Sequence, residues 1–139
     1  MATINASVTL TTDIISGVSI TKNMAMTKAG TTTGLDNTSG LSAKTVQSTT
    51  AFKLFDNADA TAGKASKVYI RNTGSSSTDY FYIGFGEDLD AATVETIGKL
   101  YGNDWMLIPW DAVAATSHDI YAKASTADAM TLEFMAFIE

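Results

Sequence analysis

Short stretches of alternating apolar and polar residues follow one another along most of the chain. An alternation with a period of two predicts β-strands that turn one face to a core. The clearest predicted strands are 66–72, 80–85, 105–110, 118–124 and 130–138, and weaker ones are 7–12, 14–21, 23–28 and 49–55. About eight to ten short strands separated by turn residues predict an all-β fold, an antiparallel β-sandwich that is jelly-roll-like.

The same alternation predicts which side chains point inward. In the strand 66–72, Val68 and Ile70 share the inner face. The strand 49–55 places Phe52 and Leu54 on one face and Phe55 on the other. The last strand turns five side chains to one face, namely Met130, Leu132, Phe134, Ala136 and Ile138. Proline cannot donate to a sheet ladder, so the strand 105–110, which contains a proline, is expected at a sheet edge or at a bulge.

Residues 1–50 and residues 51–139 differ in amino-acid composition. Residues 1–50 are rich in Thr and contain no aromatic residue, whereas residues 51–139 contain every Phe, Tyr and Trp. Aromatic side chains bury the most surface, so the core is expected within residues 51–139 of a single sandwich domain spanning 1–139. The Thr-rich N-terminal region, residues 1–50, is expected to supply edge strands or an arm that pairs with a neighbouring molecule by β-addition.

The amino-acid composition and the net charge disfavour several classes of binding site and partner. Among 139 residues there are 21 Thr and 12 Ser, which suit half-exposed strands and turns, and there is no Cys for disulfides or thiolate metal sites. The net charge of -6 disfavours nucleic acid and anionic membranes as partners. No apolar run reaches the ~20 residues of a membrane helix, and no secretory signal is recognised. The expectation is a protein made in the cytoplasm.

Residues with catalytic or metal-binding potential do not form a recognisable motif. Ser117, His118 and Asp119 are consecutive, so in a strand their side chains point to alternate faces and cannot form a relay. The acidic groups at 87–90 and 56–59 lack the spacing of a calcium loop. We therefore expect no catalytic, metal-binding or cofactor-binding residue, no cofactor, and no enzyme activity.

The aromatic residues allow two interpretations. Trp105, Trp110 and Tyr82 could form the platform of a carbohydrate-binding module. The alternative places most aromatic side chains in the core and the rest in a protein interface, where Trp and Tyr are enriched.

Several segments resemble small virion proteins of tailed bacteriophages, especially marine ones. The similarity lies in Lys67–Thr73 followed by Tyr80–Gly86, in Ile97–Trp105 followed by Ile108–Trp110, and in the ending Leu132–Glu139. The opening, Ala2–Val8, is similar as well.

The resemblance implies a structural role on the virion. Such proteins commonly form a jelly-roll-like sandwich that binds the lattice of the major capsid protein as a decoration or cement protein, often as a homo-oligomer. The alternatives are a neck, tail or head-fibre component, or the carbohydrate-binding module described above. The family carries no catalytic residues over to this chain.

Overall fold

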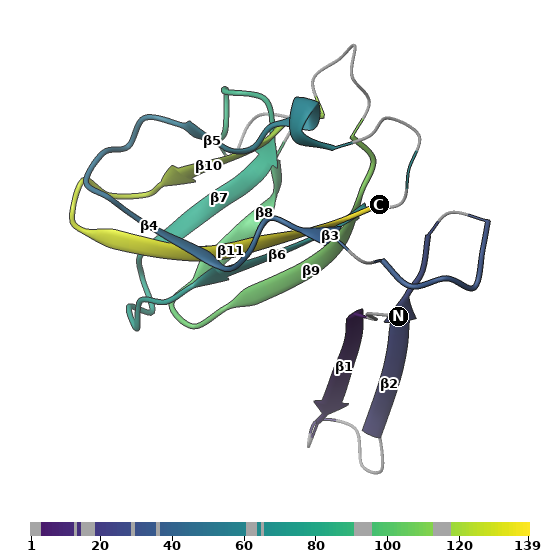
Figure 1. Cartoon of the computed structure of the whole chain (residues 1–139). Coiled ribbons are helices and arrows are strands. Elements are labelled where there is room, and N and C mark those ends of the chain that lie inside the picture. The colour runs from purple at the N-terminus through teal and green to yellow at the C-terminus, as the bar shows by residue number, and fades with distance from the viewer. Residues whose placement is uncertain are drawn as a thin grey trace. The chain divides into compact units, whose positions relative to one another are not determined.

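The computed structural model of the protein describes residues 4–12, 14, 19–28, 30–35, 37–60, 64, 66–90, 96–112 and 118–139. The chain divides into two compact units, Met1–Asp36 and Asn37–Glu139. Each unit is described by itself below. The labels of the strands are those of Figure 1.

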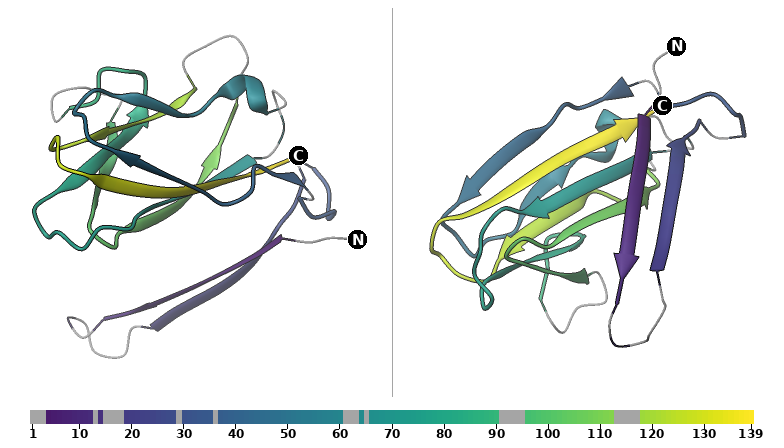
Figure 2. Two further views of the ribbon diagram at one scale, coloured as in Figure 1. Left: turned by 60° about the vertical axis from the view of Figure 1, so that its left-hand side comes forward. Right: turned by 90° about the horizontal axis from the view of Figure 1, so that it is seen from below.

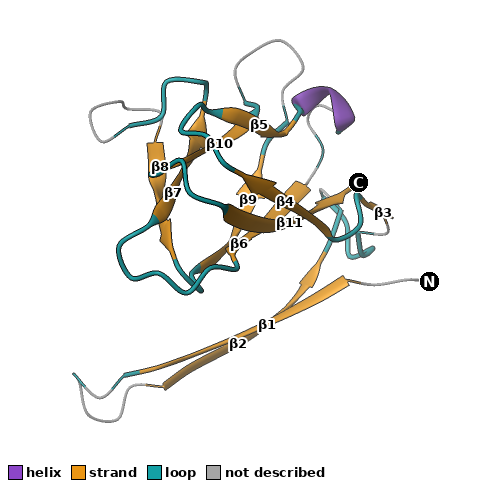
Figure 3. Ribbon diagram, turned by 90° about the vertical axis from the view of Figure 1, so that its left-hand side faces the viewer, coloured by secondary structure: helices purple, strands orange, loops and turns teal. Residues whose placement is uncertain are grey.

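The unit Asn37–Glu139 consists of two antiparallel sheets that face each other, as Figures 2 and 3 show. The first, called the β6–β11 sheet here, contains β3 (Asn37–Thr38), β4 (Ser42–Val46), β11 (Met130–Ile138), β6 (Ser66–Asn72) and β9 (Trp105–Trp110). The second, the β7–β10 sheet, has the order β5 (Phe52–Phe55), β10 (Ile120–Ala124), β7 (Tyr80–Phe85) and β8 (Thr96–Tyr101). A single turn of 3₁₀-helix, η1 (Asn57–Asp59), follows β5. The predicted all-β antiparallel sandwich is therefore confirmed.

The strands pair in a nested order. The outermost pair is β4 with β11, and inside it lie β5 with β10, β6 with β9, and finally β7 with β8. Every pair is antiparallel, and the members of each pair belong to one sheet. In this unit, residues 42–138 therefore form one long folded hairpin. Successive strand pairs of the hairpin alternate between the two sheets.

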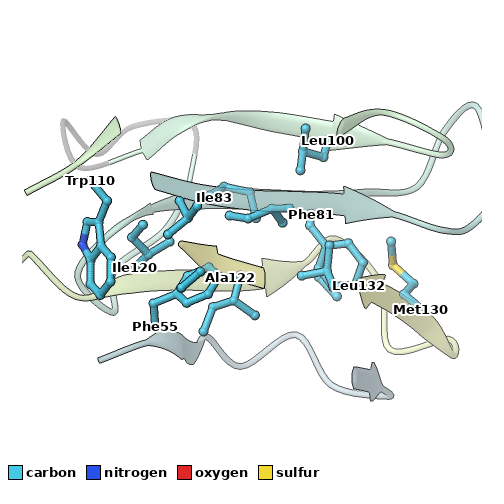
Figure 4. Packing of buried hydrophobic residues seen from close by; sticks show 14 of the residues in the cluster. Phe55, Phe81, Ile83, Leu100, Trp110, Ile120, Ala122, Met130 and Leu132 are labelled. Carbon is cyan, nitrogen blue, oxygen red and sulfur yellow. The ribbon is translucent and has the colours of Figure 1, made fainter. Parts of the chain in front are cut away.

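The core fills the space between the sheets. Val68 and Ile70 from the β6–β11 sheet are fully buried, as the alternation predicted, and so are Phe81 and Ile83 from the β7–β10 sheet. Figure 4 shows Phe81 and Ile83 of β7 in the same buried cluster as Trp110 of β9 and Leu132 of β11. The buried cluster lies entirely within residues 51–139, which confirms the location predicted from the aromatic residues.

The prediction for the strand around Phe55 is wrong in one respect. Leu54 and Phe55 are both buried, and Phe52 packs against the same cluster. The pairing of β5 with β10 shifts register between Ile120 and Tyr121. This irregularity breaks the strict alternation, so consecutive side chains both reach the core.

The edge of the β6–β11 sheet is interrupted beside β11. β3 and β4 pair with opposite ends of β11 and are separated by Ser39 and two further residues. The amide of Ser39 donates to the carbonyl of Ala136 at 3.0 Å, and the amide of Ala136 donates to the Ser39 Oγ at 2.8 Å. A serine side chain thus replaces one backbone partner where the edge strand breaks.

The unit Met1–Asp36 is built on one hairpin, called the ribbon here. It contains β1 (Ile4–Thr11) and β2 (Ser19–Met26), paired in register from Ile4 with Met26 to Thr11 with Ser19. Two strands were predicted where β2 runs as one continuous strand, and part of the predicted strand 14–21 lies outside the described residues. Met26 and Leu35 are buried, while most other side chains of the ribbon are exposed.

The sandwich begins at Asn37 and not at the start of the chain. Residues 1–50 were expected to hold either edge strands or an arm, within one domain over 1–139. β3 and β4 are edge strands, whereas the ribbon is a separate unit whose two strands pair with each other. The boundary lies at 36/37 because the pairing partners change there: β1 and β2 pair locally, and β3 and β4 pair with the last strand of the chain.

Candidate interaction surfaces

Of the consecutive residues Ser117, His118 and Asp119, the structure describes His118 and Asp119, while Ser117 lies outside the described residues. The His118 Nδ1 donates to the carbonyl of Asp111 at 2.8 Å. Asp119 instead accepts from the backbone amide of Asn57 at 2.8 Å and forms an ion pair with Lys53 at 2.6 Å. Each side chain therefore has a structural partner of its own, and they do not form a base and orienting carboxylate.

The acidic groups at 56–59 and 87–90 also have local structural roles. The Asp56 carboxylate accepts from the amide of Ala58 and caps η1. Because it also contacts Lys53 at 2.9 Å, the pKa of Asp56 is held below its usual value, first by the amide and then by the ammonium group. Within the described residues, no group of three or more His, Cys, Asp or Glu is arranged to hold a metal ion. Among those residues there is also no helix with the length and apolar character needed to cross a membrane.

The three residues proposed as a sugar platform do not come together. Trp110 is only 3% exposed, and its ring nitrogen donates to the carbonyl of His118 at 2.7 Å. Trp105 is 50% exposed but lies in β9, whereas Tyr82 lies in the opposite sheet. The platform interpretation of these residues is therefore wrong, because successive residues of β9 point to opposite sides of the sheet and Trp105 and Trp110 are an odd number of positions apart.

Two of the cavities on the sandwich are lined by described residues. One of about 310 Å³ is lined by the turn after β6 and the start of β11, and its lining includes Asp79 and Asp128. The other has a volume of about 190 Å³, and its lining includes Phe55, Trp110 and Phe134. His118 lines neither of them.

The outer face of the β7–β10 sheet carries a cluster of tyrosines and lysines, called the Tyr–Lys face here. Tyr80 and Tyr82 of β7 lie beside Tyr101 and Lys99 of β8. The hydroxyls of Tyr80 and Tyr82 are 3.1 Å apart, and the Lys99 ammonium lies 4.4 Å from the centre of the Tyr80 ring. The rings of Tyr80 and Tyr82 stand at 90°, so they offer phenol edges and hydroxyls but not one flat stacking surface.

Hydrogen bonding within this cluster changes its acidity. The Tyr82 hydroxyl, and after it the Lys99 ammonium, stabilises the ionised form of Tyr80 and lowers the pKa of Tyr80. The hydrogen bond to Tyr80 in turn raises the pKa of Tyr82 and of Lys99. Lys99 therefore stays a cation up to strongly alkaline pH.

Charges are segregated between strands and loops. Glu133 is the only Asp or Glu of the chain that lies in a strand of the described structure. Most of the cationic residues lie in strands: Lys22, Lys44, Lys53, Lys67, Arg71, Lys99 and Lys123. The sheet faces are therefore locally cationic in a protein whose net charge is -6, and the acidic residues surround them in the loops.

The outer face of the β6–β11 sheet carries a regular array of large side chains, called the apolar array here. Three strands contribute it in matching rows: Met135, Tyr69 and Leu107 form the central row, flanked by Phe137, Lys67 and Pro109 on one side and by Glu133, Arg71 and Trp105 on the other. The Tyr69 hydroxyl donates to Glu133 at 2.9 Å. Burial and this hydrogen bond raise the pKa of Tyr69.

The array differs from a solvated sheet face. A sandwich strand normally alternates apolar residues inside with polar residues outside. Here most of the nine positions are apolar or aromatic, and contiguous apolar patches of this kind mark interaction sites. Part of the signal was present in the sequence, because Met135 and Phe137 alternate with the predicted inward residues of the strand 130–138.

The ribbon has one apolar and one polar face. Residues opposite each other in an antiparallel pair point to the same side. One side carries Ile4, Ala6, Val8, Leu10, Ile20, Lys22, Met24 and Met26, and the other carries Asn5, Ser7, Thr9, Thr11, Ser19, Thr21, Asn23 and Ala25. On the polar side Ser7 donates to Asn23 at 2.7 Å. On the apolar side Leu10 is 58% exposed, Ile20 46% and Met24 43%.

Comparisons of the chain with protein-family models, with curated proteins and with solved structures gave no significant match.

Proposed function

We propose that this chain is a non-enzymatic structural component of a tailed bacteriophage particle, a decoration or cement protein bound to the lattice of the major capsid protein. One observation carries the proposal: both outer faces of the sandwich present large aromatic or apolar side chains where a solvated sheet would present small polar ones. A module that joins two layers, or a layer and its neighbours, needs such contact area on more than one side. The similarity of several segments to small virion proteins supports the same role.

The physical demands on a cement protein match these features. It must bind neighbouring coat subunits against internal pressure, which requires a rigid body and contact surfaces but no reaction. A sandwich with a continuous aromatic core supplies the rigidity. Tyr and Trp on its faces supply contact area at a low cost in conformational entropy.

The jelly-roll topology is part of the proposal. Jelly rolls contain eight strands in two Greek keys. The four nested pairs from β4–β11 inward to β7–β8, divided between two sheets, support it.

The Tyr–Lys face is the surface that we assign to the shell. It combines Tyr80, Tyr82 and Tyr101 with Lys99, and its strands contain no acidic residue. Tyrosine is enriched in protein interfaces, and a cationic face is attracted to carboxylates on a partner. The partner surface is therefore expected to be acidic.

The location is tested by measuring the number of copies per purified particle by quantitative mass spectrometry, together with imaging. Hundreds of copies on the shell support a decoration protein, whereas about a dozen copies at one vertex place the chain in the neck or tail. A chain that is absent from purified particles refutes a virion role.

The assigned face is tested by rebinding purified variants to particles that lack the protein. Lys99→Glu is expected to weaken binding at least about tenfold, because it places a carboxylate opposite an acidic partner. Lys64→Glu makes the same change of charge elsewhere on the sandwich, beside Glu139, and is expected to bind like the wild type. Equal loss in both variants would show that only the overall charge matters and would refute the assignment.

A further inference from the structure

Two apolar surfaces of this chain have no partner in the strand pairing: the apolar side of the ribbon and the apolar array of the β6–β11 sheet. A two-stranded ribbon is marginally stable in water unless its apolar side is covered. The exposed Leu10, Ile20 and Met24 are the uncovered part of that side. The array faces away from the core, because the opposite face of its three strands packs against the β7–β10 sheet.

We infer that the ribbon of one copy packs its apolar side on the apolar array of a second copy, and that the exchange is reciprocal. The result is a closed dimer in which each ribbon covers the β6–β11 sheet of the other chain. The inference does not rest on the proposed function, since it concerns the free protein in solution.

The distribution of charge favours the ribbon of a second copy as the partner of the apolar array. The unit 1–36 contains Lys22, Lys28, Asp13 and Asp36, so its formal charge is zero and the whole charge of -6 belongs to the unit 37–139. Direct contact between two sandwiches would bring like charges together, whereas a ribbon meets a sandwich without this cost.

The available area favours reciprocal exchange over contact between two ribbons. A strand of eight residues is about 27 Å long, and two strands are about 10 Å wide, so one ribbon side covers about 260 Å². Two ribbons facing each other would bury about 500 Å², which is typical of weak packing contacts. Reciprocal exchange uses two ribbon sides and two arrays and buries about 1,000 Å², the range in which specific pairs begin.

The test uses the full chain and sedimentation velocity over a range of concentrations. The wild type is expected to form a dimer, and Leu10→Glu on the apolar side of the ribbon is expected to raise the dimer dissociation constant at least about a hundredfold, because two contacts are lost per dimer. Thr9→Glu places the same carboxylate one residue away on the polar side and is expected to remain dimeric. Ile20→Glu with Thr21→Glu is a second matched pair on β2, and circular dichroism shows that each variant is folded.

The array is tested by Leu107→Glu, which is expected to give a monomer as well. A mixture of Leu10→Glu and Leu107→Glu chains keeps one intact ribbon and one intact array, so it is expected to associate more tightly than either variant alone and more weakly than the wild type. A wild type that stays monomeric at every concentration overturns the inference. So does a Leu107→Glu chain that dimerises normally, since the ribbons would then pair elsewhere, or a Thr9→Glu chain that dissociates as far as Leu10→Glu. Failure here leaves binding to particles through the Tyr–Lys face unaffected, so the two proposals are tested separately.

Discussion

Asn72 is the buried polar residue from which the strongest effect on stability is expected. It is 1% exposed at the end of β6. Its side-chain amide donates to the carbonyl of Leu100 at 3.0 Å, and its side-chain carbonyl accepts from the amide of Gly74 at 3.0 Å. Its backbone amide and carbonyl bind the turn between β8 and β9, at Asp104 and Asn103. One side chain thus joins the end of β6 to the edge strand of the opposite sheet.

The variant Asn72→Ala removes both side-chain bonds and leaves the backbone bonds in place. The Leu100 carbonyl would lose its partner in a buried position, at a cost of about 1–3 kcal/mol. The Gly74 amide is half-buried and regains water in part, so its loss costs about 0.5–1.5 kcal/mol. The expected decrease in the free energy of unfolding is therefore about 2–4 kcal/mol, a large fraction of the 5–15 kcal/mol typical of a domain.

The assay is urea unfolding at pH 7 followed by tryptophan fluorescence, with Thr73→Ala as the control. Thr73 is the exposed neighbour, and its hydroxyl donates to the Thr131 carbonyl at 3.1 Å, so the control removes one exposed bond and should cost less than about 1 kcal/mol. A decrease for Asn72→Ala no larger than that of the control would refute the argument. It would mean that the two buried groups find other partners.

Three further outcomes are expected. Gly102→Ala lowers the melting temperature, because an added Cβ would lie 2.6 Å from backbone of the facing loop, and an unchanged melting temperature would show that this loop yields freely. In a spectrophotometric titration Tyr80 loses its proton below the ordinary tyrosine value of 10.0, because the Tyr82 hydroxyl and the Lys99 ammonium stabilise the phenolate. In Lys99→Met this early step moves to higher pH, and a titration identical to the wild type would contradict it. Acrylamide quenches the fluorescence of Trp105, which is 50% exposed, and Trp105→Phe removes the quenched component while the buried tryptophan stays protected.

The strands with a strong local pattern were predictable to the residue. The bounds of β6, β7, β9 and β11 are those that the alternation predicted, and β9 lies at a sheet edge as its proline suggested. In these segments the burial of one face, the β-propensity of the side chains and the flanking turn residues all favour the same strand boundaries. The turn between β8 and β9 contains Asn103, which has a positive φ of 67°.

β4 and β8 could not be predicted in the same way. The sequence of β4 is mostly small and polar, and it forms a strand because β11, more than eighty residues later, offers it an edge. β8 contains Gly98, and its pairing with β7 has a register shift, so local alternation is weak. The interaction surfaces were missed for a similar reason: outward-facing side chains form an array only after three distant strands are placed side by side.

The break at Ser39 has a consequence for contacts between copies of this protein. An unbroken outer strand exposes a full row of backbone donors and acceptors, and another chain can lengthen the sheet along it without limit. Here that row is split between β3 and β4, and a serine hydroxyl occupies the gap. A strand from another molecule could pair with only one short half at a time, so this edge is a poor template for lengthening the sheet.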